Sequence, residues 1–66
     1  MTAWRTIKAR RLLAALLRIG WRVARERGSH RILVRDGWAP FVFAFHDNVE
    51  VGPRILPAIA KRTGLR

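Results

Sequence analysis

Hydrophobic and polar residues first repeat at helical spacing near the N-terminus, between about residues 8 and 19. Apolar residues share one broad stripe there and arginines occupy the other side, a pattern that predicts an amphipathic helix with one face in a core. The apolar residues are Leu12, Leu13, Leu16, Leu17 and Ile19, and the arginines are Arg10, Arg11 and Arg18. Thr6 is a candidate cap for the start of this helix, and Gly20 suits its end.

Three segments with the pattern of β-strands follow the helix. The predicted strands are residues 21–27, 30–35 and 41–46. In the first of them, Trp21 and Val23 lie on one side and Arg22 and Glu26 on the other, as in an outer strand with one wet face. The third carries a stripe of Phe41, Phe43 and Phe45. This stripe is more typical of a core than of a base-stacking platform, because so short a chain has few other large side chains to bury.

Two glycine-containing turns connect the predicted strands. Gly28-Ser29 provides a tight connection between the first two. Asp36-Gly37 predicts a two-residue hairpin between the last two, because both positions accept the positive φ that such turns require. Trp38, beside this hairpin, is the better candidate for an exposed stacking or partner contact.

A second amphipathic helix is predicted at about residues 54–62, after a loop over 47–53. Its apolar stripe is Ile55, Leu56, Ile59 and Ala60, and Pro57 fits only if it lies in the first turn. The order helix, three strands, helix predicts an α+β fold of the α-β-β-β-α type seen in double-stranded-RNA-binding domains (dsRBDs). In that arrangement the sheet is three-stranded and antiparallel, with two helices on one face. We expect one domain over residues 1–66, with 1–6 as a loose N-terminal arm.

The net charge of the chain indicates an acidic partner. The 66 residues contain 14 Lys and Arg against 4 Asp and Glu, which gives a formal net charge of +10. Such an excess favours nucleic acid or another polyanion as the partner. There is no cysteine for a disulfide or a thiolate metal site, and the two histidines and four carboxylates form no recognisable ligand set. We therefore expect no metal and no small-molecule cofactor.

The leucine-rich stretch over residues 12–19 raises the question of a membrane. It is too short to span a bilayer and is interrupted by Arg18, and no small-residue cleavage site follows it. A membrane-active basic peptide is a further class that this stretch suggests, but the hairpin and the aromatic strand argue against it. The sequence therefore predicts a cytoplasmic protein without a membrane partner.

The candidate chemistry lies around the Gly28-Ser29 turn. His30 follows the turn, and histidine exchanges protons near neutral pH. Arg25, Arg27 and Arg31 surround it, and the guanidinium fork can bind two phosphate oxygens at once. Together with the Ser29 hydroxyl, these side chains predict a place that holds and cuts a phosphodiester.

Structural alternatives exist for several of these residues. If Asp36-Gly37 forms a tight hairpin, alternation places His30 on the face of Ile32 and Val34, where it would be a core histidine. Ser29 is also a common turn residue, since its hydroxyl bonds the local backbone. His46, at the end of the third predicted strand, is more typical of a residue that caps the following loop, and it is also a candidate for RNA contact or proton transfer.

The series of motifs resembles the HicA family, the toxins of HicA–HicB toxin–antitoxin pairs. The residues that carry the resemblance are Gly20-Trp21, Arg25, Arg27-Gly28-Ser29-His30, His46, Glu50, Pro53 and Gly64-Leu65. The family implies a ribonuclease that cleaves mRNA on a dsRBD-like fold, with the histidine of Gly-Ser-His, here His30, as the essential residue. It also implies a HicB-like antitoxin that binds the toxin and masks its site. The chain departs from the family with Leu33 in place of an aromatic residue, Ala44 in place of a proline, and Arg54-Ile55 at the second helix.

The residues and the resemblance together predict a toxin that is an endoribonuclease. His30 is expected to act as general base or general acid while the ribose 2′-hydroxyl attacks the adjacent phosphate of mRNA, without a metal. The expected RNA contacts are Arg25, Arg27, Ser29, Arg31 and His46. The alternative is a module of dsRBD-like fold that binds RNA without cutting it.

Overall fold

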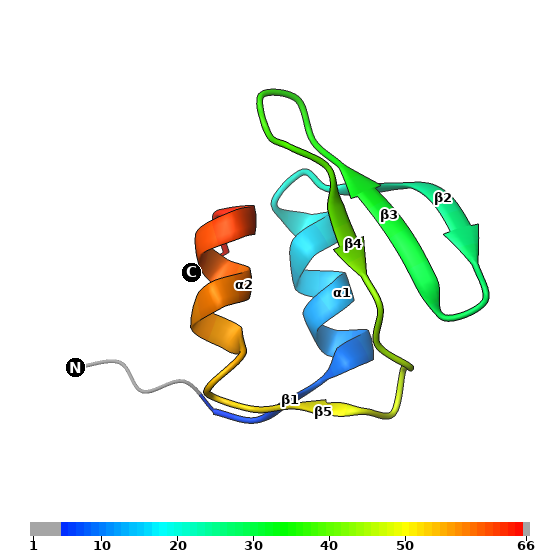
Figure 1. The fold of residues 1–66 in the computed structure, drawn as a ribbon. Coiled ribbons are helices and arrows are strands. Elements are labelled where there is room, and N and C mark those ends of the chain that lie inside the picture. The colour runs from blue at the N-terminus through cyan, green and yellow to red at the C-terminus, as the bar shows by residue number, and fades with distance from the viewer. Residues whose placement is uncertain (1–4, 66) are drawn as a thin grey trace.

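The computed structural model describes residues 5–65 of the chain. The elements follow one another as β1 (Ile7–Lys8), α1 (Ala9–Arg18), β2 (Arg22–Arg27), β3 (His30–Val34), β4 (Phe41–Phe43), β5 (Glu50–Val51) and α2 (Leu56–Thr63) (Figure 1). Strands β2, β3 and β4 form an antiparallel sheet in that order. The predicted α+β fold with two helices and a three-stranded antiparallel sheet is confirmed. Most of the predicted N-terminal arm, including Trp4, lies outside the described residues.

Both helices cover the same face of this sheet, which we call the inner face. Leu33 of β3 and Phe43 of β4 are fully buried in one cluster with residues of α1 and α2. From the helices the cluster takes Ala9, Leu12, Leu16, Leu56 and Ile59. Phe41 and Phe45 pack against it, so the prediction that the phenylalanine stripe belongs to the core is confirmed. Leu17 and Ile55, which were predicted to be buried, are exposed. Leu17 lies at the margin of the apolar stripe of α1, and Ile55 precedes the first residue of α2.

Strands β1 and β5 form a second, two-stranded sheet. Ile7 lies opposite Val51 and Lys8 opposite Glu50. The two residues of β5 lie in the segment 47–53 that was predicted as a loop, and Lys8 was predicted to begin the first helix. This pairing also changes how α1 begins. The residue before the helix is Lys8, not Thr6, and no side chain caps the helix. Backbone carbonyls of the loop before β5 do so instead, since Ala9 N donates to Val49 O at 2.8 Å.

The connection between β3 and β4 is longer than the predicted two-residue hairpin. Leu33 pairs with Phe41, which leaves residues 34–40 between the paired positions. Gly37 has φ of 85°, but no non-glycine residue in the described part of the chain has positive φ. Trp38 N donates to Arg35 O at 3.0 Å, so the turn is of type II, which needs positive φ only at its third residue. The third strand also ends at Phe43 instead of His46.

Packing on the end of α2 explains this longer connection. The Trp38 ring lies edge-on to Trp21 with centroids 6.1 Å apart, and the Arg35 guanidinium lies 5.2 Å above the Trp38 ring. Trp21 is buried, and its Nε1 donates to the carbonyl of Thr63 in the last turn of α2 at 2.9 Å. Gly64 then ends α2 in the left-handed conformation, with φ of 76°. Two tryptophans thus join the sheet to the C-terminal helix.

Replacing Gly64 by alanine will destabilise the fold by about 2 kcal/mol. The left-handed backbone alone costs an alanine about 1 kcal/mol. In addition, an added Cβ would lie 2.8 Å from the Trp38 ring, so the ring must move. Thermal unfolding followed by circular dichroism measures the loss, as a lower melting temperature by about 4–8 °C per kcal/mol. Gly37→Ala is the matched control, because Gly37 also has positive φ but nothing within 4 Å of its added Cβ. Equal losses for the two variants would contradict the contact with Trp38.

Candidate functional site

The β2–β3 hairpin divides the predicted site residues between two faces of the sheet. Residues directly opposite one another on antiparallel strands point to the same face. Arg27 lies opposite His30, and Glu26 lies opposite Arg31. Arg31 also lies opposite the buried Phe43, so the Glu26–Arg31 pair is on the inner face. His30 and Arg27 are therefore on the outer face, which the helices do not cover.

Three of the predicted residues gather on this outer face. Arg25, Arg27 and His30 line one pocket of about 230 Å³, together with Ile32 and Val42. All three polar side chains are exposed. The alternative that His30 is a core histidine is wrong. His30 does share a face with Ile32, as alternation predicted, but the face that enters the core is that of Leu33.

A β-bulge in β2 extends the row of arginines on the outer face. Arg22 lies opposite Val34 and Arg25 opposite Ile32, with a register shift between Val23 and Arg25. In a regular strand, residues three apart point to opposite faces, whereas here both arginines face outward with Arg27. The predicted alternation, which put Arg22 and Glu26 on one side, is therefore wrong. The sequence signal of the bulge is a break in the alternation, because the apolar positions Trp21 and Val23 are followed at the same spacing by Arg25 and Arg27; this signal was not used, and Arg22 was missed.

The other predicted residues line a second cleft, at the end of the hairpin. This cleft is about 460 Å³ and forms where the Gly28-Ser29 turn meets the loop after β4. Its polar lining includes Ser29, Arg31, His46 and Asp47. Ser29 is half-buried and the His46 side chain is exposed. The His46 carbonyl accepts a hydrogen bond from Val49 N at 3.0 Å, which holds the turn of the loop. The structure thus brings Ser29, Arg31 and His46 together, but not with Arg25, Arg27 and His30.

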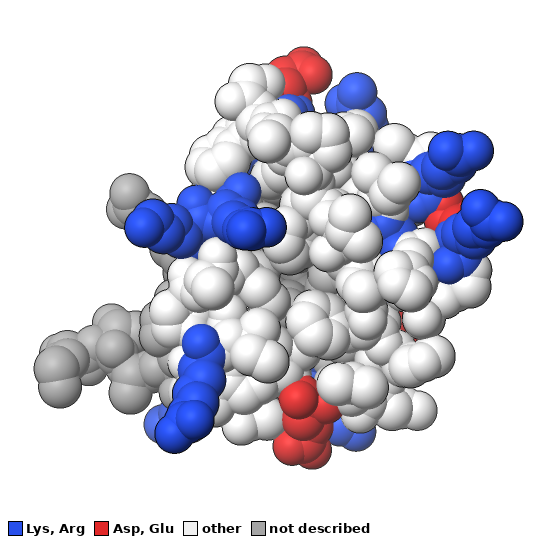
Figure 2. Space-filling model, in the orientation of Figure 1, with Lys and Arg blue, Asp and Glu red and all other residues white. Residues whose placement is uncertain are grey.

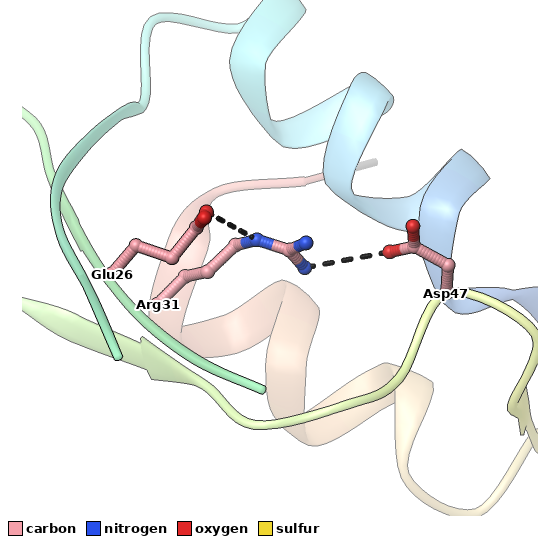
Figure 3. Close-up of polar contacts among 3 residues, drawn as sticks. All are labelled: Glu26, Arg31 and Asp47. Atoms are coloured by element: carbon pink, nitrogen blue, oxygen red, sulfur yellow. Dashed lines mark hydrogen bonds and ion pairs between the residues drawn. The ribbon is translucent and has the colours of Figure 1, made fainter. Parts of the chain in front are cut away.

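Arg31 bridges two carboxylates at this cleft. Its Nε lies 3.0 Å from Oε1 of Glu26, and its Nη1 lies 3.5 Å from Oδ1 of Asp47 (Figure 3). The Arg31 side chain is only 19% exposed, whereas both carboxylates are 58% exposed. Nη1 is buried and has no well-formed hydrogen bond, so its contact with Asp47 is mainly electrostatic. A guanidinium that is this buried needs negatively charged partners. By contacting both carboxylates, Arg31 links β2 and β3 to the loop after β4.

Within residues 5–65, no three His, Asp or Glu side chains gather closely enough to hold a metal ion. Among the helices that the structure describes, none is both long enough and apolar enough to cross a membrane.

Comparison with known protein families gives a match over most of the chain. The family model described as the HicA toxin of bacterial toxin–antitoxin systems matches residues 9–65, from the first residue of α1 to the residue after Gly64. No curated protein and no solved structure matches the chain. Because the family model covers most of the chain, the protein belongs to the HicA family of bacterial toxin–antitoxin toxins.

Proposed function

We propose that this toxin is an endoribonuclease that cleaves mRNA with His30 as its catalytic residue. The family is one of mRNA-cleaving toxins, which supports the substrate. The observation that carries the proposal is the cross-strand pair of Arg27 and His30 on the exposed outer face. A proton-transfer group and a phosphate-binding group lie side by side there, open to a polymer substrate.

In the proposed reaction, the ribose 2′-oxygen attacks the adjacent phosphorus while the bond from phosphorus to the 5′-oxygen breaks. Neutral His30 takes the proton of the 2′-hydroxyl, and the resulting imidazolium gives a proton to the leaving 5′-oxygen. The products are a 2′,3′-cyclic phosphate and a 5′-hydroxyl. The reaction needs no electron transfer and no metal. With one histidine in both roles, we expect slow turnover.

Arg25 and Arg27 are the proposed phosphate ligands, because both are exposed beside His30 in the same pocket. A guanidinium fork stabilises the negative charge that develops on the phosphate oxygens in the transition state. Arg31 is less suited to this role, since Glu26 and Asp47 already face its nitrogens. Ser29 and His46 remain candidates for contact with a further nucleotide in the second cleft.

As a toxin of a toxin–antitoxin pair, the protein has an antitoxin partner. We propose a HicB-like protein that neutralises the toxin by covering His30. The proposed location is the cytoplasm, where mRNA is translated.

Incubation of the purified toxin with a defined single-stranded RNA in EDTA tests the function. Cleavage on a denaturing gel supports a metal-independent ribonuclease. Salt-sensitive binding with intact RNA after long incubation contradicts the proposal and favours the RNA-binding module, because the arginine row alone is sufficient to hold phosphates.

We expect the double variant Arg25→Gln, Arg27→Gln to bind single-stranded RNA about tenfold or more weakly, because two phosphate contacts are lost. The slope of log affinity against log salt concentration should decrease in magnitude by roughly 1.4, or about 0.7 for each charge. Fluorescence anisotropy of a labelled RNA over a salt series measures both quantities. The matched control is Arg10→Gln, Arg11→Gln, which removes two exposed charges from α1. Equal weakening by the two pairs would mean that RNA binds by net charge alone.

A further inference from the structure

Strand β4 has one unpaired edge. In the sheet order β2-β3-β4, β4 pairs with β3 only among the described residues. An unpaired edge offers backbone N–H and C=O groups to another strand, and charged side chains commonly protect such edges. The other edge strand, β2, carries arginines, whereas the β4 residues Phe41, Val42 and Phe43 carry no charge. The edge of β4 is therefore open to pairing.

A groove with an apolar floor runs along this edge, between β4 and α2. One hollow of about 310 Å³ is lined by Phe41, Val42, Phe45, Ala58 and Ile59, among others, and by Arg62. A second hollow of about 300 Å³ continues it past Pro40 and Trp38, and shares Phe41 and Arg62 with the first. We call the two hollows together the β4–α2 groove. In Figure 2 the surface between α2 and β4 is free of charged side chains, which lie at its margins.

The charges at the margin of the groove are positive. Lys61 and Arg62 are exposed in the last turn of α2, and both line the groove. No acidic residue is among the residues that line it. A partner therefore has to combine apolar side chains for the floor with acidic side chains for this margin.

Two other occupants fit the groove less well. A second copy of this chain, paired edge to edge, would bring its own Lys61 and Arg62 against those of the first, in a protein whose net charge is +10. RNA has no backbone groups that continue a β-sheet, and the arginine row on the outer face suits its phosphates better. A peptide strand satisfies both the edge and the floor.

We propose that the antitoxin partner docks in the β4–α2 groove with an extended segment of alternating acidic and apolar residues, which adds a fourth strand beside β4. Apolar side chains that face α2 rest on the floor, and acidic side chains of the segment reach Lys61 and Arg62 at the margin of the groove. The inference rests on the toxin–antitoxin pairing, but not on the proposed cleavage.

A strand at this position would also bring the rest of the antitoxin close to His30. Strands of a sheet lie about 4.8 Å apart, so the added strand is about 10 Å from β3, which carries His30. Val42 is 54% exposed and lines both the groove and the outer-face pocket that contains His30, so the two surfaces are continuous. Antitoxin residues that flank the added strand can then extend over the outer face.

The test uses the full chain labelled with ¹⁵N and a synthetic peptide of alternating Glu and Val with blocked ends. We expect amide shift changes and slower hydrogen exchange in β4, at Phe41–Phe43, when the peptide binds. The first control is the same peptide with alternate amide nitrogens methylated, which cannot pair as a strand and should not bind. The second is the Lys-Val peptide, which should not bind to a cationic margin.

Matched variants then test the cationic margin. Lys61→Glu, Arg62→Glu should weaken binding of the Glu-Val peptide about tenfold or more, since two attractions become repulsions. The control is Arg10→Glu, Arg11→Glu, which makes the same change in net charge on α1. This control should weaken binding of the peptide much less.

Several results would overturn the inference. One is that the peptide changes amide shifts only in the arginine row. Another is that the methylated peptide binds as tightly as the unmethylated one. A third is that the two charge-reversal pairs weaken peptide binding equally. Concentration-dependent shifts at β4 without any peptide would show that a second copy occupies the groove, and the same shifts with an RNA oligonucleotide would show that RNA does. Because His30→Ala leaves the groove intact, peptide binding by this variant separates a failure of the docking inference from a failure of the proposed cleavage.

Discussion

His30→Ala will reduce the rate of RNA cleavage by about 100-fold or more, because it removes the proposed proton-transfer group from the outer face. His30 is exposed and takes no part in the hydrophobic core, so the substitution should leave the fold intact. RNA affinity should also change little, since Arg25 and Arg27 remain in place. The effect should therefore be on the cleavage rate at saturating RNA and not on binding.

The measurement is the initial rate of cleavage of a defined RNA on a gel, for the wild type and the variant. Thermal unfolding of both proteins must coincide, to show that the fold is unchanged. His46→Ala is the matched control, because His46 is also exposed but lies in the second cleft. If His30→Ala cleaved RNA or stopped cell growth as well as the wild type, the catalytic assignment would be wrong. A large loss with His46→Ala alone would place the chemistry in the second cleft.

Trp21→Ala will leave the protein unfolded at 25 °C. Trp21 is only 2% exposed, and truncation of a buried aromatic side chain to alanine costs about 3–5 kcal/mol. The substitution also leaves the carbonyl of Thr63 without the hydrogen bond from Trp21 Nε1. Edge-on contacts of the Trp21 ring with Trp38 and Phe41 are lost as well. A chain of 66 residues has little stability in reserve, so these losses together are expected to exceed it.

Circular dichroism and urea unfolding measure this effect. Trp38→Ala is the control. Because Trp38 is 39% exposed, its truncation should lower the free energy of unfolding less. Trp21→Phe should give an intermediate loss, since it retains an aromatic ring but cannot donate to Thr63. If Trp21→Ala unfolded cooperatively and at the same urea concentration as the wild type, the contact between Trp21 and α2 would not be needed for the fold.

The elements that could be predicted are those whose pattern is local. The stripe with Leu12 and Leu16 is long enough to specify a helix, and Phe43 lies in a segment that alternates along one strand. The order of helices and strands followed from such patterns, and with it the fold class. The position of His30 after a glycine turn, and its place among arginines, were also visible in the sequence.

The parts that could not be predicted depend on contacts between distant residues. Strands β1 and β5 are two residues each, too short for any periodicity, and they exist because the core brings Ile7 beside Val51. The Asp36-Gly37 turn follows the packing of Trp38 on the end of α2, which outweighs the local preference for a two-residue hairpin.

The candidate site shows the same division. The sequence by itself determined the chemistry that this protein carries: one histidine at a glycine turn, an excess of arginine, and enough periodic apolar residues to build an α+β fold. Tertiary structure alone decided which of these groups lie together. The bulge in β2 turned Arg22 outward beside Arg25 and Arg27, and the burial of Arg31 directed its charge to Glu26 and Asp47. The physical reason is that strand register and ion pairing depend on which residues lie opposite one another, and the local pattern of a strand does not contain that information.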